Sequence, residues 1–339
     1  MKTTAETALE NLFYTWCNEM PEVTQPLPPT ASKRNYFRIK SSNYTAMGAH
    51  NPNYKENNAF ISISRFLLNE EIHVPEIYLT DLKNNIYLLE DLGDKTLFSF
   101  IREKSQHCEA PFELKRILRD TLKKLAWIQI MCGKKMDFSV CYPYRKFSEE
   151  SILWDMNYFR KQFIDQIKIP YHAEKLQKDF QQFADFIMQA DNDYLMYRDF
   201  QSRNIMLHHN ELYFIDYQGM RKGPLQYDVA SFLFQARAAL PEDIREEMLE
   251  YYIKTASLLA PLNKKEFLQF YYPVALVRVL QTLGAYGLRG LKEGKQHFIK
   301  SIPPALKNLY LLKEKNQLTA ELPELNRVLK ELKLIKNVP

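Results

Sequence analysis

The sequence predicts an α+β fold in two lobes: a small, strand-rich lobe over residues 1–92 and a larger, mostly helical lobe over residues 93–339. In the first, short apolar and aromatic runs are bounded by turn-forming residues, which is typical of strands. In the second, apolar residues recur three and four positions apart over long stretches, which is typical of amphipathic helices. A chain of 339 residues is long enough for each lobe to bury a core of its own.

The first lobe begins with a predicted helix over residues 5–19, where apolar side chains recur at helical spacing. Four prolines between residues 21 and 29 break that pattern and indicate a linker. Strands and one further helix follow. The predicted strands cover residues 36–40, 44–47, 76–80 and 86–90, and the predicted helix covers residues 57–68.

The second lobe is predicted to be helical apart from one strand-rich stretch. Helices are predicted over residues 112–131, 150–165 and 174–189, and again from Asp228 onward. The predicted strands between them cover residues 194–197, 205–207 and 212–215. Near the end, leucines recur from Leu318 to Leu332, with Pro323 placed for a first helical turn. This pattern predicts a final amphipathic helix that packs on its own domain rather than on a partner.

Composition and charge narrow the class of protein. Apolar residues make up 46% of the chain and charged residues 26%, which fits an ordinary globular protein and argues against disorder. The net charge of +5 is too small to require a nucleic-acid partner. Basic residues crowd one helix that also has an apolar face, so we expect a solvated face and no nucleic-acid binding. They are Lys115, Arg116, Arg119, Lys123 and Lys124.

Cysteine spacing and the first residues of the chain favour a reducing compartment. The four cysteines form no Cys-x-x-Cys pair, so reduced thiols are expected rather than a zinc site or disulfides. No uncharged apolar run approaches the ~18 residues of a membrane helix, and the first residues lack the apolar core of a signal peptide. We therefore expect a cytoplasmic protein without membrane contact. The sequence leaves its oligomeric state open.

Three polar side chains form the pattern from which we predict a reaction. A predicted strand leads into Asp199, Asn204 follows five residues later, and a predicted hairpin returns the chain to Asp216, so we expect these side chains to converge. Phosphoryl transfer needs such a set, because a carboxylate can take the proton of an acceptor hydroxyl and Mg²⁺ prefers carboxylate and amide oxygens. We predict ATP and Mg²⁺ as cofactors, with Asp199 as catalytic base and Asn204 and Asp216 as metal ligands. GTP in place of ATP is left open.

The same residues resemble a known family. Their spacing is similar to that of the catalytic and metal-binding loops of protein kinases and their small-molecule relatives. Within that group, Tyr197–Asn204 and Ile215–Gln218 resemble the aminoglycoside phosphotransferase family, especially its branch of N-acetylmuramate/N-acetylglucosamine anomeric sugar kinases. The likeness extends over roughly residues 28 to 312. It includes the hinge-like Leu88–Gly93, the nucleotide-hairpin-like Ala31–Arg38 and, more softly, Gly223–Ser231, Arg278–Gly284 and Ile302–Pro303.

The resemblance implies a protein-kinase-like bilobal fold, with nucleotide binding in the first lobe and with catalysis and acceptor binding in the second. It implies that the backbone from Glu90 to Leu92 meets the adenine and that Ser32, Lys33 and Arg34 approach the phosphates. The acceptor would be a small molecule, an amino sugar that is phosphorylated on its anomeric hydroxyl. The resulting sugar 1-phosphate would enter nucleotide-sugar synthesis in cell-wall recycling.

Two departures from the family concern the phosphates. The glycine-rich loop is missing, since residues 31–35 contain no glycine. The lysine of the third strand is missing from residues 44–47. The cations that could replace it are Lys33, Arg34 and Lys40. Because the partner lysine is missing, Glu56 is expected to be a surface charge.

Several other polar residues keep more than one interpretation. Arg203 in the loop is a candidate contact of phosphate or of the acceptor, or a solvated residue. Arg278 and Gln281, one helical turn apart, are candidate acceptor contacts or members of a structural salt bridge. Asp228 is expected to cap a helix. Tyr197 replaces the usual histidine before the catalytic Arg-Asp, a change expected to alter packing more than chemistry.

Three functions compete on this reading. The leading one is a kinase of N-acetyl amino sugars. A choline-, ethanolamine- or aminoglycoside-type kinase is the alternative enzyme, but it would need an acidic pocket, and the arginines near the loop favour the sugar. A degenerate nucleotide-binding regulator is suggested by the missing glycines and lysine. The complete set of Asp199, Asn204 and Asp216 argues against it.

Overall fold

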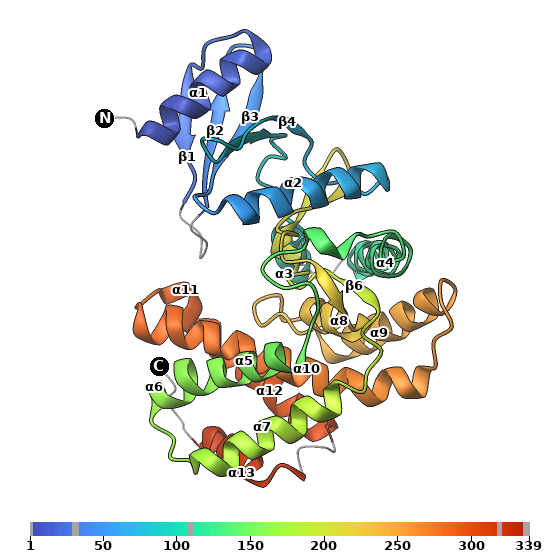
Figure 1. Cartoon of the computed structure of the whole chain (residues 1–339). Helices are drawn as coiled ribbons and strands as arrows, with labels where there is room; N and C mark the ends of the chain where they lie inside the picture. Colours follow the sequence, from blue (N-terminus) through green and yellow to red (C-terminus); the bar gives the residue numbers. More distant parts are fainter. Residues whose placement is uncertain (1–2, 29–33, 107–110, 317–320, 335–339) are drawn as a thin grey trace. The chain divides into compact units, whose positions relative to one another are not determined.

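The computed structural model describes residues 3–28, 34–106, 111–316 and 321–334. The chain divides into two compact units, whose elements are shown in Figure 1. Unit 1 consists of Met1–Phe100, Met136–Arg145 and Ser202–Met220; unit 2 consists of Ile101–Lys135, Lys146–Gln201 and Arg221–Pro339. Two later segments thus belong with the first hundred residues. The assignment of nucleotide binding to residues 1–92 and of catalysis to residues 93–339 stays a prediction.

Unit 1 is built on a five-stranded antiparallel sheet with the order β1-β2-β3-β5-β4. Helix α1 lies along this sheet and contacts four of its strands (Figure 1). The core beneath α1 is apolar and includes Leu9, Phe13, Ile39 and Leu88, each fully buried. The elements are α1 (Thr4–Cys17), β1 (Val23–Pro26), β2 (Asn35–Lys40), β3 (Thr45–His50), α2 (Tyr54–Asn69), β4 (Ile77–Asp81) and β5 (Ile86–Leu89).

The predicted linker between residues 21 and 29 is wrong over Val23–Pro26, which forms strand β1. This strand pairs antiparallel with β2, with Val23 opposite Lys40 and Pro26 opposite Phe37. It is an edge strand, where a proline is tolerated because one side of the strand has no partner that needs its N–H. The other strands predicted for this sheet are confirmed to within a few residues.

A hairpin from later in the chain completes unit 1. It consists of β7 (Ile205–His208) and β8 (Glu211–Phe214), preceded by a short 3₁₀ turn over Ser202–Asn204. Backbone hydrogen bonds tie it to the earlier residues of the unit: Leu207 N–H donates to Lys95 at 2.8 Å, and Phe214 N–H donates to His73 at 2.9 Å. These bonds attach the hairpin to the unit that carries the sheet. Asn204 and Asp216, at the two ends of the hairpin, therefore belong to that unit.

Unit 2 is helical and contains one small two-stranded sheet, β6 (Tyr194–Met196) paired with β9 (Arg221–Gly223). Helix α10 is its longest helix and packs against α5, α8 and α12. The helices are α3 (Leu97–Gln106, which begins in unit 1), α4 (Pro111–Trp127), α5 (Glu149–Phe159), α6 (Asp165–Ile167), α7 (Ala173–Ile187), α8 (Leu225–Leu233), α9 (Glu242–Ser257), α10 (Lys264–Tyr286), α11 (Gln296–Ile299), α12 (Ile302–Lys315) and α13 (Pro323–Leu334).

Three π-helical segments interrupt the helices of unit 2: Ile128–Cys132, Arg160–Ile164 and Gly287–Lys292. The second and third contact each other closely, because a Cβ on Gly287 would lie 1.8 Å from the carbonyl oxygen of Gln162. Only glycine allows this approach. The contact fixes the end of α10 against the segment that follows α5.

The final helix, α13, is confirmed to pack on its own domain, since it contacts α7 and buries Leu325, Leu329 and Leu332. Leu318, with which the predicted pattern begins, lies outside the described residues. On α4, Lys115 and Arg119 both bind Glu247 of α9 at 2.6 Å. Within the described ranges, no helix is long and apolar enough to cross a membrane.

Candidate active site

Unit 1 contains a cavity of about 200 Å³ beside its sheet. One wall is apolar and includes Met47 of β3, Phe60 of α2 and Met206 of β7. The polar part of the lining includes Asp216 and the residues from Glu90 to Asp94 that follow β5. A cavity with an apolar lining and a few polar groups has the chemistry that a purine nucleotide requires.

The segment after β5 is held by Arg38, which lies on β2 and lines the cavity. Its guanidinium binds Asp91 through Nε at 2.7 Å and through Nη2 at 3.0 Å. It also binds Asp94 at 2.9 Å and the carbonyl oxygen of Gly93 at 3.2 Å. Gly93 has φ +74°, a conformation that favours glycine. The backbone predicted to meet adenine, Glu90 to Leu92, is thus fixed on the wall of the cavity.

Arg34 and Glu56 form an ion pair in unit 1, in which the arginine is buried and the glutamate is partly exposed. Nη2 of Arg34 lies 2.8 Å from Oε1 of Glu56, and the arginine side chain is 3% exposed. Its guanidinium lies 5.0 Å above the ring of Phe60, which lines the cavity. Burial by itself would lower the pKa of Arg34, but the neighbouring Tyr36, Tyr87 and Glu56 raise it above its usual value. Arg34 is therefore a cation next to this cavity.

This pair corrects the expectation that Glu56 is a surface charge. Glu56 lies in the first turn of α2 and is bound by Arg34, which immediately precedes β2, rather than by a cation of β3. The sequence reasoning missed it because the partner was expected at the lysine position of the third strand. Of the other predicted phosphate contacts, Ser32 and Lys33 lie outside the described residues, and Lys40 is exposed at the end of β2.

Asn204 and Asp216 meet in unit 1. Nδ2 of Asn204 lies 3.2 Å from Oδ2 of Asp216, and Gln218 donates to Oδ1 of Asp216 at 2.8 Å. Asp216 has φ +66°, a conformation that a non-glycine residue adopts at a cost and that is common at functional sites. No group of three or more His, Cys, Asp or Glu side chains that could hold a metal occurs in the described ranges. A carboxylate and an amide are the hard oxygen donors that suit Mg²⁺ shared with phosphate oxygens.

Asp199 belongs to unit 2, in the loop that follows β6. The residue before it, Arg198, has φ +80°. Two backbone groups of this loop donate to Asp228: Tyr197 N–H at 2.7 Å and Arg198 N–H at 2.9 Å. Asp228 is fully buried on α8. Its burial raises its pKa to about 7, although the hydrogen bonds from the loop act in the opposite direction.

The prediction that Asp228 caps a helix is therefore wrong. Helix α8 begins three residues earlier, at Leu225, with Pro224 in the cap position. Asp228 lies inside the helix, where its side chain accepts hydrogen bonds from the backbone of the loop before Asp199 instead of from the helix end. In the sequence, Asp228 was marked only by its place soon after the predicted metal site, within the family-like segment Gly223–Ser231.

Arg198 is anchored from two sides. Its Nη2 binds both oxygens of Asp155 on α5, at 2.9 and 3.0 Å, and its Nη1 donates to the hydroxyl of Tyr227. Burial alone would lower the pKa of Arg198, but Asp155 raises it above its usual value. Sequence reasoning did not identify Asp155 or Tyr227. These contacts stabilise the unusual backbone conformation immediately before Asp199.

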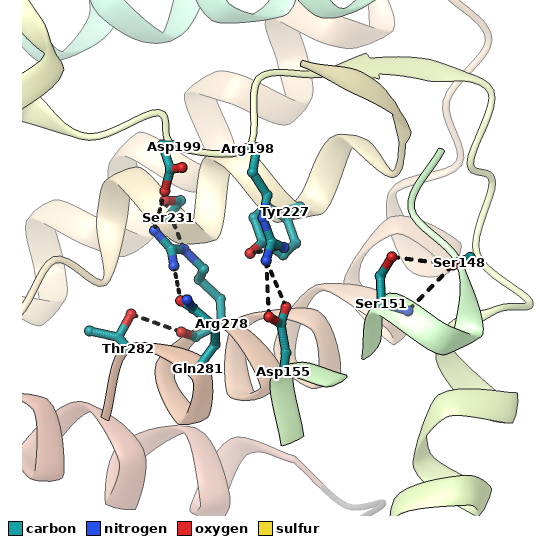
Figure 2. Close-up of polar contacts among 10 residues, drawn as sticks. All are labelled: Ser148, Ser151, Asp155, Arg198, Asp199, Tyr227, Ser231, Arg278, Gln281 and Thr282. Atoms are coloured by element: carbon teal, nitrogen blue, oxygen red, sulfur yellow. Dashed lines mark hydrogen bonds and ion pairs between the residues drawn. The ribbon is translucent and has the colours of Figure 1, made fainter. Parts of the chain in front are cut away.

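Arg278 lies beside Asp199, with Gln281 on the other side of its guanidinium, as Figure 2 shows. Nη2 of Arg278 lies 3.2 Å from Oδ1 of Asp199, and Nη1 of Arg278 donates to Oε1 of Gln281. The Asp199 side chain is 43% exposed and can therefore meet a small molecule. Arg203 lies in unit 1 and is exposed. The expected convergence of Asp199 with Asn204 and Asp216 stays a prediction.

Comparison with known proteins agrees with this chemistry. Residues 23–263, most of the chain, match the phosphotransferase enzyme family. The chain belongs to that family. N-acetylmuramate/N-acetylglucosamine kinase of Pseudomonas aeruginosa is 23% identical to it over 330 residues, which cover 94% of this chain and 93% of the relative.

Two solved structures share the fold. A choline kinase from Streptococcus pneumoniae aligns with a TM-score of 0.61 at 14% identity, covering 91% of this chain and 99% of the other. An amicoumacin kinase in complex with AMP-PNP and Ca²⁺ aligns with a TM-score of 0.62 at 11% identity, covering 92% of this chain and 94% of the other. The predicted protein-kinase-like fold, with a strand-rich unit and a helical unit, is confirmed, and the protein is a small-molecule kinase.

Proposed function

We propose that this kinase transfers the terminal phosphoryl group of ATP to the anomeric hydroxyl of an N-acetyl amino sugar, such as N-acetylglucosamine or N-acetylmuramate. The observation that carries the proposal is the surrounding of Asp199. Its carboxylate is paired with Arg278, whose guanidinium also binds Gln281. Guanidinium and amide groups bind the hydroxyl, amide and carboxylate oxygens of such sugars. The names of the relatives point to the same acceptors.

The nucleotide is proposed to occupy the cavity of unit 1. The adenine would lie between Met47, Phe60 and Met206, with its polar edge on the backbone of Glu90 and Leu92. We propose ATP as the nucleotide. The phosphates would lie toward Arg34, with Ser32 and Lys33 as further proposed contacts.

Asn204 and Asp216 are the proposed ligands of Mg²⁺. The fit rests on their oxygens, since one carboxylate and one side-chain amide complete an oxygen shell together with phosphates and water. The bound ion would neutralise charge on the β- and γ-phosphates. Asn204 would turn its amide oxygen toward the ion. Its present hydrogen bond to Asp216 would then be replaced by binding of both side chains to the same ion.

Asp199 is the proposed catalytic base. It would take the proton of the acceptor hydroxyl while that oxygen attacks the terminal phosphorus and ADP departs. Arg278, Gln281 and Arg203 are the proposed acceptor contacts. We also propose a cytoplasmic location, where ATP and sugar are both present, and entry of the sugar 1-phosphate into nucleotide-sugar synthesis.

The two alternatives receive less support from the same residues. A choline, ethanolamine or aminoglycoside acceptor carries a positive charge and would need carboxylates, but the carboxylate of Asp155 is bound by Arg198 and that of Asp199 by Arg278. A degenerate regulator was suggested by the missing lysine. The pair of Arg34 and Glu56 supplies a buried cation in its place.

The experiment is an acceptor screen with Mg-ATP, in which ADP release is measured with N-acetyl amino sugars, amino alcohols and aminoglycosides. We expect turnover on an N-acetyl sugar, and we expect Asp199→Asn to lower it at least ~100-fold, the usual scale for a positioned general base. Asp193→Asn is the matched control, because Asp193 is an exposed carboxylate of the same unit whose partner is Lys222. Turnover of choline or an aminoglycoside but of no sugar would contradict the proposal.

A further inference from the structure

Arg278 is a buried arginine that reaches an exposed carboxylate. Its side chain is 6% exposed, whereas that of its partner Asp199 is 43% exposed. A buried guanidinium is costly unless its donors are satisfied. The partners of Arg278 therefore show what this side chain is built to do.

Three groups hold the guanidinium of Arg278 from different elements (Figure 2). Its Nε donates to Oγ of Ser231 on α8 at 3.1 Å. Its Nη1 donates to Gln281, one turn further along α10. Its central carbon lies 5.7 Å above the ring of Tyr227, also on α8. The remaining nitrogen, Nη2, is directed at Asp199.

The two ends of the ion pair differ in their exposure to solvent. Arg278 is fixed between two packed helices, α8 and α10, by hydrogen bonds and by burial. Asp199 lies on a loop, and its carboxylate is open to solutes. An ion pair of this kind constrains the exposed partner rather than the buried one, because the guanidinium fork has a fixed geometry.

We propose that Arg278 is a positioning residue for Asp199, in addition to any contact it makes with the acceptor. This inference rests on the proposed function. In the transfer step, the proton of the acceptor hydroxyl passes to Asp199, the acceptor oxygen forms a bond to the terminal phosphorus, and the bond from that phosphorus to the bridging oxygen of ADP breaks. Arg278 keeps its own protons throughout and sets the orientation of the carboxylate that receives the new one.

The test compares Arg278→Gln and Arg278→Lys with a matched control, Arg245→Gln. Arg245 is a half-buried arginine of the same unit whose partners are Asn308 and the ring of Phe234. We expect Arg278→Gln to lower kcat about 100-fold, the scale of a misplaced catalytic group, with the KM for Mg-ATP unchanged within about threefold. Arg278→Lys keeps the charge and should recover part of the loss. The control should keep kcat within about threefold while losing similar thermal stability.

A second measurement does not require an acceptor. The thermal midpoints of Arg278→Gln, Asp199→Asn and the double variant are compared with that of the unchanged protein. If the two side chains are coupled, the double variant loses less than the sum of the single losses. Additive losses would overturn the pairing on which the inference depends.

The kinetic outcomes separate this inference from the proposed function. The contrary result is that Arg278→Gln raises only the KM for the acceptor and keeps kcat within threefold of that of the unchanged protein. That result would show that Arg278 binds the acceptor, and it would overturn the positioning role. If no sugar of the acceptor screen is turned over, only the proposed function is overturned. The coupling between Arg278 and Asp199 is still measured by unfolding.

Discussion

At the scale of single residues, the ion pair of Arg34 and Glu56 places a buried cation beside the proposed nucleotide cavity. We predict that Arg34→Gln raises the KM for Mg-ATP about tenfold or more, because a charged donor to phosphate is lost. Arg34→Lys should recover part of the affinity. The measurement is ADP release as a function of Mg-ATP concentration.

Lys40→Gln is the control for that prediction, since Lys40 is the exposed cation at the other end of β2. It should leave the KM for Mg-ATP within about twofold, because exposed charges contribute little. If Lys40→Gln weakens Mg-ATP binding and Arg34→Gln does not, the phosphate cation has been assigned to the wrong residue.

Asp228 predicts an unusual dependence of stability on pH. Burial raises its pKa to about 7 in the folded protein, so folding favours the neutral acid. A carboxyl group whose pKa is higher in the folded than in the unfolded protein contributes stability at pH values below its unfolded pKa. This contribution is lost as the pH rises through about 7. Carboxylates with lowered pKa values, such as Glu324 at about 2, act in a lower range and with the opposite sign.

We therefore expect the unchanged protein to lose about 3 kcal/mol more than Asp228→Asn between pH 4.5 and pH 7.5. The variant should be less stable at pH 5, because one of the two loop N–H groups loses its acceptor. Urea unfolding at several pH values measures both effects. Parallel stability curves for the two proteins would rule out the raised pKa.

The residues that sequence reasoning found and missed differ in where their partners lie. Asn204 and Asp216 stood out because their spacing after Asp199 is a local pattern, and the structure places these two together. Asp155 and Asp228 act on Arg198 from elements that lie 43 and 30 residues away along the chain. No local pattern reveals a partner at that distance, because the fold rather than the spacing brings it there.

At the scale of elements, periodicity predicted most helices and strands, and it failed where the backbone departs from regular geometry. The edge strand β1 was taken for a linker because of its prolines. The predicted helix over residues 112–131 ends in the π-helical turn Ile128–Cys132. Apolar spacing does not distinguish a π turn from an α turn over five residues, so such segments are seen only in the structure.

The contact between two π-helical segments gives a prediction about α10, the helix that carries Arg278. Gly287→Ala should destabilise the protein by about 2–4 kcal/mol, because its Cβ would lie 1.8 Å from the backbone oxygen of Gln162 and the segments must separate. Gly290→Ala is the control, since its Cβ would be 3.1 Å from the nearest atom. Equal melting temperatures for the two variants would contradict the close contact.

At the scale of the whole molecule, the residues proposed to act in the reaction are divided between two units. The cavity, the pair of Arg34 and Glu56, and the proposed metal ligands belong to unit 1, whereas Asp199 and Arg278 belong to unit 2. The chain passes from unit 2 to unit 1 between Gln201 and Ser202, within the loop that holds both Asp199 and Asn204. A predicted boundary at residue 92 could not reveal this, because periodicity shows the strand-rich stretch around residues 194–215 but not the unit on which those strands pack.

The chemical identity of the product tests the account most directly. The purified protein is incubated with Mg-ATP and N-acetylglucosamine or N-acetylmuramate, and the product is examined by ³¹P NMR. We predict a sugar phosphate whose phosphorus couples to the anomeric proton, formed by the unchanged protein and lost in Asp199→Asn. A phosphate on another hydroxyl of the sugar, or phosphorylation of choline while both sugars remain unchanged, would contradict it.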